Sequence, residues 1–560
     1  MHTISTKNYI RIFFKAICVL LALSLALLCA CGRGNDAVDA DAQADAQTSL
    51  VPEASTKTVI DAQLNLSMPI DTSVIDPYEI TSYKMQSLVP LVFESPITLD
   101  ADGSPKAYLC QSWTANEDGT VTFTVRDNVL FHDGTAFDAS HIAYGIERAM
   151  QSENYRYVSS YIDKYSVSDD NKQITIKPKK GVINLVLHMD FPITGMNGTI
   201  GTGPYKVDDI RAGSGMSLSV NEAWWMKQPE IKNIYAKAIE GDEAQIQSLL
   251  AGEIDVVYAR GQDISAYMSS GKYLSMSLTT PSYEYIVFNT KNELMADKNL
   301  RLAIAYSLDR RTMISNAYFG NVTMSDTPMN AQSWIGSGSS SMLEQDMKKA
   351  IEYISACGFT DTEGDGFFDN GIAAESTNAP NATLSPDSTP EPISYEPIKL
   401  KIITNTDTQS SAHKEAANMI AAQLESLGLK AEVKMYEMDD LSDELEDGNF
   451  DIAVLATYLG NSVDLYDLYH SSGKLNYSGY SSSAVDSMIE RHIAALDEAE
   501  YVDTAIKTQE MIIEDMPVLG IGFKNSAMLY SQDIEGIGRI DSYNIFSNID
   551  AWRVEEDEQH

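Results

Sequence analysis

Apolar and polar residues alternate in several short segments of the first third of the chain. The clearest case is 121–125, Val-Thr-Phe-Thr-Val, which directly follows the turn pair Asp118-Gly119. Alternation with a period of two predicts a strand with one buried face. Similar patterns predict further strands at 59–66, 98–103, 174–176 and 183–187, and helical spacing predicts a helix at 83–93. We therefore expect a strand-rich subdomain at 84–198.

From residue 201 the pattern changes to strands and helices in alternation, which is typical of an α/β sheet. The first block has strands expected at 205–210, 216–220, 234–239, 254–257 and 285–289, with helices at 243–251 and 298–308. The second block has strands expected at 398–403, 431–435 and 450–455, with helices at 411–427 and 441–446. The chain is long enough for two or three hydrophobic cores.

These blocks predict an α/β protein with two lobes and a β-rich subdomain inserted in the first. Clefts between domains are favoured ligand sites, so we expect the ligand between the lobes. The hinge is expected near 282–289 and again near 524–530. Lobe 1 is assigned 58–83, the β-rich part 84–198, 199–283 and a return at 526–560; lobe 2 is assigned 284–525, with a disordered, proline-rich insertion at 376–396.

The first thirty residues have the pattern of a secretory signal. Lys7, Arg11 and Lys15 precede an uncharged apolar run at 16–30, which is shorter than the about 20 residues that span a bilayer. The run ends in Leu-Cys-Ala-Cys, and the last of these, Cys31, resembles the lipidated cysteine of a bacterial lipobox. We predict a signal peptide at 1–30, a lipid anchor at Cys31 and a flexible tether at 31–57; the alternative is an ordinary signal peptide with two incidental cysteines.

Charge and cysteine content narrow the classes of partner. The chain has 40 Lys and Arg against 80 Asp and Glu, and the predicted signal peptide removes three basic residues and no acidic one. Such a negative chain is unsuited to nucleic acid or an anionic membrane surface. Only Cys110 and Cys357 remain beyond Cys31, and no metal-binding spacing of Cys or His occurs. We predict no cofactor, no resident metal and a monomer, lipid-anchored on the extracytoplasmic face of the cell membrane.

The segment Phe-His-Asp-Gly-Thr at 131–135 admits two interpretations. His132 beside Asp133 could be a pair of catalytic groups, whereas Asp-Gly supplies the conformation that a tight turn needs. No G-x-S-x-G or other nucleophile context accompanies the pair. We therefore predict a structural turn and no enzymatic activity; a hydrolase that depends on His132 is the alternative.

One loop resembles a calcium site. Oxygen donors stand at positions 1, 3, 5 and 9 of a loop that starts at residue 361, with Gly366 at position 6. Position 12 is Ile372, so the bidentate carboxylate of a calcium loop is missing. The loop is therefore a weak calcium candidate, through Asp361, Glu363, Asp365 and Asp369.

A series of motifs in one order resembles the oligopeptide, dipeptide and nickel class, family 5, of the extracytoplasmic solute-binding proteins of ATP-binding cassette importers. The matching segments are Leu-Val-Phe-Glu at 91–94, Ser-Trp at 112–113, Val-Leu-Phe-His-Asp-Gly-Thr at 129–135, the helix at 139–149, Gly-Thr-Gly-Pro-Tyr at 201–205, Asn221 to Trp225, Leu-Ala-Gly-Glu-Ile-Asp at 250–255, Phe-Asn-Thr at 288–290 with 301–310, and Met-Pro at 516–517. The resemblance implies a periplasmic-binding-protein-like clamshell of type II, cluster C. It also implies partners: a permease and a cytoplasmic ATPase.

The resemblance implies capture of an oligopeptide or dipeptide. In peptide binders of the family, a loop after the strand at 450–455 carries an Asp that holds the peptide ammonium. Here Asn461 stands at that position, with Tyr458 at the family's Trp and Asp464 at a second Asp. Because Asn lacks the charge that strengthens a bond to ammonium, a peptide ligand requires Asp464 or Asp467 to take that role.

Aromatic residues near strand ends complete the predicted site, although core packing is the default role of such residues. The predicted ligand-binding residues are Tyr83, Tyr283, Tyr285, Trp334, Tyr458, Asn461 and Asp464. Two alternatives stay open: a sensory or signalling lipoprotein of the same fold, and a binder of a non-peptide solute such as a sugar, a nickel chelate or haem.

Overall fold

The computed structural model describes residues 63–260, 273–336, 343–373, 395–406, 411–460, 465–540 and 542–554. The predicted signal peptide, the lipidation candidate Cys31 and the tether lie outside these residues, as does most of the predicted insertion. The described chain combines helices with both parallel and antiparallel strands around several hydrophobic cores, among them a main core in each lobe. The predicted α/β class with two lobes is confirmed.

Lobe 1 is built on a four-stranded sheet of order β1-β10-β9-β8, in which β1 is parallel to β10 and the other pairs are antiparallel. In β1, every second side chain is buried, as its alternating sequence requires. Helix α2 packs the apolar residues of its inner face against the same core. The elements are β1 (Gln63–Met68), α2 (Tyr83–Val92), β8 (Tyr205–Arg211), β9 (Gly215–Val220), β10 (Asn233–Ala238) and α5 (Asp242–Leu250).

A second four-stranded sheet, of order β4-β5-β7-β6 and fully antiparallel, lies within the segment that we predicted to be strand-rich. Helix α3 covers it; Asp138 begins that helix by accepting a hydrogen bond from the Ser140 amide at 2.9 Å. The elements are β2 (Ile97–Leu99), β3 (Pro105–Ala107), β4 (Cys110–Ala115), β5 (Val121–Val125), α3 (Ala139–Gln151), η1 (Arg156–Ser160), β6 (Ile162–Val167), β7 (Gln173–Pro178) and α4 (Val182–Leu187).

The strand predicted at 183–187 is wrong, because these residues form helix α4. All six residues of α4 are buried, including Asn184. A short segment that is buried on every side has no polar face, so its sequence carries no period that separates helix from strand.

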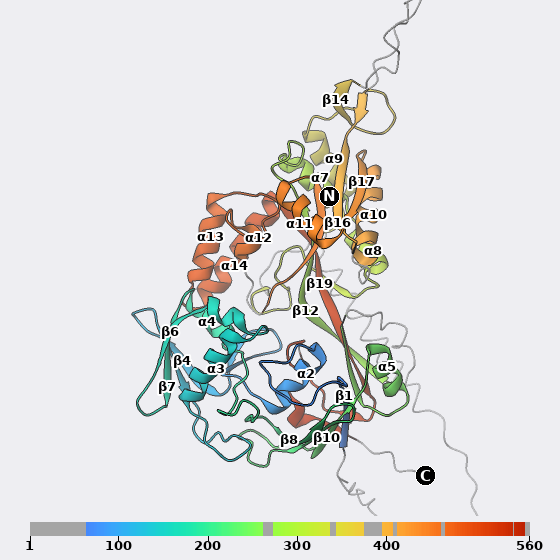
Figure 1. The fold of residues 1–560 in the computed structure, drawn as a ribbon. Helices are drawn as coiled ribbons and strands as arrows, with labels where there is room; N and C mark the ends of the chain where they lie inside the picture. Colours follow the sequence, from blue (N-terminus) through green and yellow to red (C-terminus); the bar gives the residue numbers. More distant parts are fainter. Residues whose placement is uncertain are drawn as a thin grey trace, which may run out of the picture. The chain divides into compact units, whose positions relative to one another are not determined.

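Lobe 2 is built on a seven-stranded sheet of order β11-β19-β12-β18-β16-β17, with β13 paired to β19. Helices cover this sheet, and the long helices α13 and α14 lie side by side (Figure 1). The strands are β11 (Val256–Arg260), β12 (Tyr273–Phe288), β13 (Val322–Met324), β16 (Lys399–Asn405), β17 (Lys430–Tyr436), β18 (Ile452–Tyr458) and β19 (Val518–Ser531). The helices are α7 (Lys298–Ser307), α8 (Arg310–Ala317), α9 (Met347–Ala356), α10 (Ser411–Ser426), α11 (Met438–Asp447), α12 (Leu465–Tyr469), α13 (Ser483–Ala494) and α14 (Glu498–Asp515).

Four short strands and one short helix complete the described chain. Strand β14 (Asp369–Ala373) pairs with β15 (Tyr395–Pro397), so the last two residues of the insertion that we predicted at 376–396 belong to a strand. Near the C-terminus, β20 (Ile534–Glu535) pairs with β21 (Arg553–Val554), and η3 (Ile549–Ala551) precedes β21.

Strands β12 and β19 form a long antiparallel ribbon that belongs to both cores (Figure 1). At one end of the ribbon, Leu278 and Met528 pack in the core of lobe 1; at the other, Ile286 and Leu519 pack in a core of lobe 2. The register of the pair shifts between Thr279 and Tyr283, where the ribbon passes from one lobe to the other. The ribbon therefore connects the lobes through paired backbone.

A second connection joins the lobes through α4. The Gly181 amide donates to the Ile493 carbonyl at 2.7 Å, and the Val182 amide donates to the Ala495 carbonyl at 3.1 Å, at the C-terminal end of α13. The Asn184 side chain also donates to the Ile493 carbonyl. Apolar side chains of both lobes pack beside these bonds, among them Ile183, Leu187, Met329, Tyr501 and Ala505.

The core of lobe 1 takes residues from both ends of the described chain. Leu64 of β1 and Trp552, which follows η3, are both fully buried in it. The Trp552 indole also donates to Asn548, so the C-terminal segment is fixed by packing and by a hydrogen bond.

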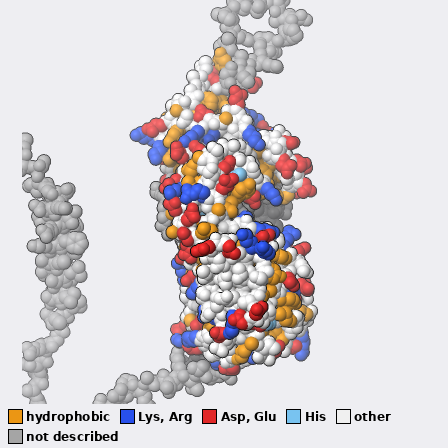
Figure 2. Space-filling view, turned by 90° about the vertical axis from the view of Figure 1, so that its left-hand side faces the viewer, with side chains coloured by type: hydrophobic (Ala, Val, Ile, Leu, Met, Phe, Trp, Pro, Cys, Tyr) orange, Lys and Arg blue, Asp and Glu red, His pale blue; other side chains and the backbone are white. Residues whose placement is uncertain are grey.

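The helices of the described ranges include none that is both long and apolar enough to cross a bilayer. Acidic and basic side chains are interspersed on the face that Figure 2 shows, where they form no broad basic surface. This distribution agrees with the excess of Asp and Glu in the sequence.

Candidate ligand-binding site

His132 and Asp133 lie in a turn, where both act on the backbone. The Asp133 carboxylate accepts from the Thr135 amide at 2.9 Å, and the Gly134 amide donates to the Phe131 carbonyl. The His132 ring contacts the Gly203 carbonyl through Nε2 at 3.1 Å, and the His132 amide donates to the Gly201 carbonyl. His132 thus joins the two motifs Phe-His-Asp-Gly-Thr and Gly-Thr-Gly-Pro-Tyr, and Asp133 closes the turn of the first.

The second motif needs glycine for a steric reason. A Cβ atom on Gly201 would lie 1.8 Å from the carbonyl oxygen of Val92 at the end of α2. Backbone cannot yield to such an overlap, so the segment can approach α2 only without a side chain. The family motif is thereby explained by packing within lobe 1.

Replacing His132 with Gln is expected to reduce the acid sensitivity of the fold. Burial lowers the pKa of His132 from 6.5 to about 4, so the unfolded chain binds a proton that the folded chain rejects between these values. The folded state therefore loses stability as the pH falls from 6.5 toward 4. Between pH 7 and pH 4.5 the wild type should lose about 2 kcal/mol more unfolding free energy than H132Q, which keeps a donor for Gly203.

Urea unfolding at each pH measures this difference. A substitution of His141 provides the comparison with another histidine. The ring of His141 accepts a hydrogen bond from the Asp138 amide at the start of α3. Equal losses in the wild type and H132Q would show that His132 is not the residue responsible.

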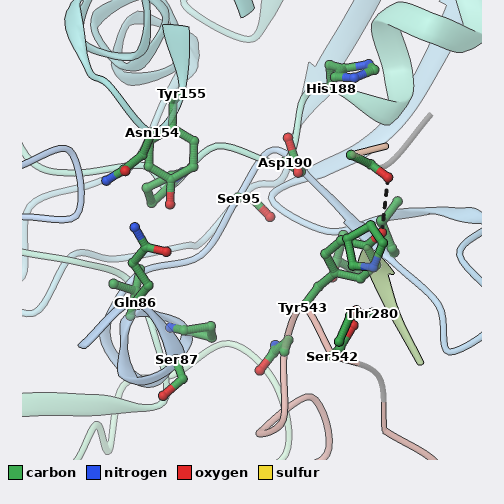
Figure 3. A pocket seen from close by; sticks show the side chains of 18 of the residues that line it. Gln86, Ser87, Ser95, Asn154, Tyr155, His188, Asp190, Thr280, Ser542 and Tyr543 are labelled. Carbon is green, nitrogen blue, oxygen red and sulfur yellow. Dashed lines mark hydrogen bonds between the residues drawn. The ribbon is translucent and has the colours of Figure 1, made fainter. Parts of the chain in front are cut away.

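A cavity with a volume of about 820 Å³ is lined by both lobes and by the ribbon between them. Lobe 1 contributes α2 and the segments around Tyr157 and Asp190, and lobe 2 contributes the end of β18 and Asp467. Figure 3 shows Gln86, Asn154 and Tyr155 on one side of the cavity and Asp190, Ser542 and Tyr543 on the other. Its volume is in the range of sites that enclose small organic ligands, about 300–1,000 Å³.

Tyrosine side chains supply much of the cavity wall. They are Tyr108, Tyr155, Tyr157, Tyr161, Tyr258, Tyr458 and Tyr543. The Tyr161 ring stacks on the His188 ring, with centroids 3.6 Å apart, and the Tyr543 hydroxyl donates to the Gly460 carbonyl at 3.2 Å. Such rings offer large apolar contact area together with a polar atom, which suits an organic ligand with mixed chemistry.

Asp190 is held in place by a neighbouring tyrosine. The Tyr157 hydroxyl donates to Asp190 Oδ1 at 2.7 Å. Burial, followed by the charge of Asp190, raises the pKa of Tyr157 well above its usual value, so Tyr157 stays a neutral donor. Asp190 follows α4 directly, which places a carboxylate in the cavity close to the interlobe contact of that helix.

Glu94 also lines the cavity but is almost fully buried. Its Oε1 accepts from the indole nitrogens of Trp224 and Trp225, each at 3.0 Å. Burial raises the pKa of Glu94, and the hydrogen bonds oppose that rise. Glu94 therefore fixes both Trp side chains of the Asn221 to Trp225 motif next to the cavity residue Tyr108, whose ring lies 5.7 Å from that of Trp225.

The predicted ligand-binding residues do not lie together in one site. Tyr458 lines the cavity and is 66% exposed. Tyr283 and Tyr285 stack on each other within a core of lobe 2 and are fully buried. Trp334 lines a neighbouring cavity of about 570 Å³ and stacks on Tyr501, and the Tyr83 hydroxyl donates to Asp242. Asn461 and Asp464 lie outside the described residues.

Several cavity residues were missed by the sequence reasoning. Three of them, Asp190, His188 and Tyr157, stand in segments without a motif. The fourth, Lys524, lies inside the hinge segment that we predicted near 524–530. Only their position in the fold brings them together. Glu94 belongs to the Leu-Val-Phe-Glu motif at 91–94, and its carboxyl group was the one signal that could have suggested a role in the cavity.

The calcium candidate loop uses its carboxylates for its own backbone. Asp361 accepts from the amides of Gly364, Asp365 and Gly366, and Asp369 accepts from Thr362. Among the described residues, no three acidic, His or Cys side chains are grouped as metal ligands. The loop is thus an internally hydrogen-bonded turn.

The sequence model for the bacterial extracellular solute-binding proteins, family 5, matches residues 104–479, more than half of the chain. The chain is a family 5 solute-binding protein. This binding protein therefore belongs to the class that captures ligands for ATP-binding cassette permeases, as the motif series predicted.

Known relatives bind different ligands. This binding protein is 24% identical over 363 residues to the oligopeptide-binding protein AppA of Bacillus subtilis, covering 63% of this chain and 62% of AppA. It is 26% identical over 290 residues to the nickel-binding periplasmic protein of Escherichia coli, covering 47% of this chain and 55% of that protein. Each match thus spans less than two thirds of the relative.

The solved structures share the fold over most of this binding protein. That of AppA from Bacillus subtilis in complex with a nonapeptide matches with a TM-score of 0.57 at 20% identity, covering 88% of this chain and 99% of AppA. At this identity the match establishes the two-lobed fold.

Proposed function

We propose that this binding protein captures a short peptide between its lobes and delivers it to an ATP-binding cassette permease, without catalysing a reaction. A lipid on Cys31 would hold it at the extracytoplasmic face of the cell membrane. The observation that carries the proposal is the cavity, which is lined by tyrosine rings and by carboxylates of both lobes. A peptide offers the matching features: apolar side chains, amide groups and a terminal ammonium.

Asp190 is the proposed partner of the peptide ammonium. It lines the cavity, and the hydrogen bond from Tyr157 at 2.7 Å fixes the position of its carboxylate before a ligand arrives. Asp467 lines the cavity from α12 of lobe 2 and adds negative charge. These two groups compensate for Asn461, which stands where related peptide binders have an Asp.

Replacing Asp190 with Asn is expected to weaken peptide binding by about tenfold to a hundredfold, the worth of one charge-assisted hydrogen bond. Asn keeps an acceptor for the Tyr157 hydroxyl, so the substitution removes charge and leaves shape. Isothermal titration with a library of di- to hexapeptides measures the effect, and N-acetylated peptides should show the same loss with the wild type.

Asp163, an exposed residue of β6 that does not itself line the cavity, is the matched control for loss of one negative charge. Asp163→Asn should bind as the wild type does. If no di- to hexapeptide binds the folded wild type, the peptide assignment is wrong.

A further inference from the structure

The cavity contains one fixed cation. Among the described residues that line it, Lys524 is the only Lys or Arg, whereas Glu94, Asp190 and Asp467 are acidic. Lys524 lies in β19 opposite Val322, at the crossing between the lobes, and its carbonyl accepts from the Thr280 hydroxyl at 2.8 Å. An anionic group of a ligand in the cavity could therefore pair with the Lys524 ammonium.

A buried carboxylate holds the Lys524 side chain. Lys524 Nζ lies 2.9 Å from Glu284 Oε1; the Glu284 side chain is fully buried, and that of Lys524 is 33% exposed. The Tyr318 hydroxyl donates to Glu284 Oε2 at 3.2 Å. The ammonium is therefore pre-positioned at the cavity wall, which reduces the entropy lost when a ligand binds.

Glu284 has a second basic partner on its far side. His413 Nε2 lies 2.5 Å from Glu284 Oε2, and His413 Nδ1 lies 2.6 Å from Asn405 Oδ1. Each ring nitrogen thus faces an oxygen atom, so His413 links the Glu284 carboxylate to Asn405.

Glu284 is shared between its two basic partners. Burial would raise the pKa of Glu284, but the hydrogen bond and charge of His413 and the charge of Lys524 hold it below its usual value, so Glu284 stays ionised. His413 contacts the Oε2 atom of Glu284 and is 7% exposed, whereas Lys524 contacts the Oε1 atom and is 33% exposed. The Lys524 ammonium can therefore contact an anionic group in the cavity while it keeps its contact with Glu284.

We propose that Lys524 binds a carboxylate of the ligand and thereby makes the site selective for zwitterions, molecules with a free ammonium and a free carboxylate. This inference rests on the proposed function, because it assigns the second end of the ligand whose ammonium Asp190 holds. A free short peptide meets the requirement, whereas a peptide amide or an internal segment of a longer chain does not.

The test compares a tripeptide with its C-terminal amide on the wild type and on Lys524→Met, by isothermal titration. The wild type should bind the free acid about tenfold to a hundredfold more tightly than the amide, as expected for one charge-assisted bond. K524M should bind both forms with similar, low affinity. K524R keeps the charge and should retain a preference for the acid.

Lys507→Met is the matched control, because Lys507 is exposed on α14 and pairs only with its helix neighbour Asp503 among the contacts described. K507M should keep the acid preference of the wild type. Thermal unfolding of each variant shows that the lobes are intact, and the comparison of acid and amide on the wild type needs no substitution at all.

An acid-to-amide affinity ratio that is equal in the wild type and K524M would overturn the inference while leaving peptide binding established. If no peptide binds, the proposed function fails, and native mass spectrometry of the co-purified ligand decides about Lys524. The experiment then compares that ligand with an analogue whose anionic group is neutralised. The assignment is supported if the analogue binds the wild type at least about tenfold more weakly than the ligand does, and if K524M binds the two equally. A ligand without an anionic group overturns it.

Discussion

Replacing Arg310 with Met should lower the free energy of unfolding by about 3 to 5 kcal/mol, the usual cost of removing one partner of a buried ion pair. Arg310 and Asp326 are almost completely buried, and Nη2 lies 2.6 Å from Oδ1. Arg310 also donates to the carbonyl oxygens of Gly520 and Leu343. The substitution leaves the Asp326 charge in the core together with two carbonyl groups that lose a donor.

Urea unfolding monitored by circular dichroism measures the loss, and hydrogen exchange of β13 and β19 locates it in lobe 2. A double variant, Arg310→Met with Asp326→Leu, should recover a large part of the stability, because no unpaired charge remains. Arg311→Met is the control: Arg311 pairs with Glu344 at the surface, where such pairs are worth about 0–1 kcal/mol. A loss in R310M no larger than in R311M would show that the pair is dispensable.

Replacing Gly181 with Ala should weaken ligand binding about thirtyfold, which corresponds to about 2 kcal/mol for two hydrogen bonds and part of an apolar contact. A Cβ atom on Gly181 would lie 2.4 Å from the Ile493 carbonyl oxygen, so the N-terminus of α4 must move away from α13. The other end of α4 leads to His188 and Asp190 in the cavity. Separation of the lobes therefore becomes easier, and the ligand should be released faster.

Stopped-flow measurement of the dissociation rate tests this result, with small-angle scattering to compare the separation of the lobes. Gly195→Ala is the matched control, since the nearest atom to its Cβ would be 3.4 Å away, an ordinary contact distance. The expected change is in the dissociation rate, with little effect on association. An unchanged dissociation rate in G181A would show that α4 does not hold the lobes together.

Much of the fold follows from local sequence patterns. Strand β5 coincides with the predicted 121–125 because its alternation is strict and one face is buried. Strand β12 was predicted only at 285–289, although it begins at Tyr273. Pro281 and the Ser and Thr residues before it argue against a strand, and they are accommodated because the register shifts between Thr279 and Tyr283.

The site was less accessible to prediction because it depends on tertiary position. Tyr283 and Tyr285 are two residues apart, so both rings point to the same face of β12, and that face is a packed core. Asp190 enters the cavity from a segment after a helix that the sequence did not reveal. Lys524 becomes distinctive only through Glu284 and His413, which lie far away in the sequence.

The burial of Leu64 beside Trp552 in one core has a consequence for the order in which the chain folds. Because these residues are separated by most of the chain, lobe 1 cannot complete its core until the C-terminal segment has been synthesised. Contacts of such long range form late, since the loop between them must first be closed. Lobe 2, whose core residues all fall between those two, can reach its packed state first. Lobe 1, which contains the first described strand, therefore completes its folding after lobe 2.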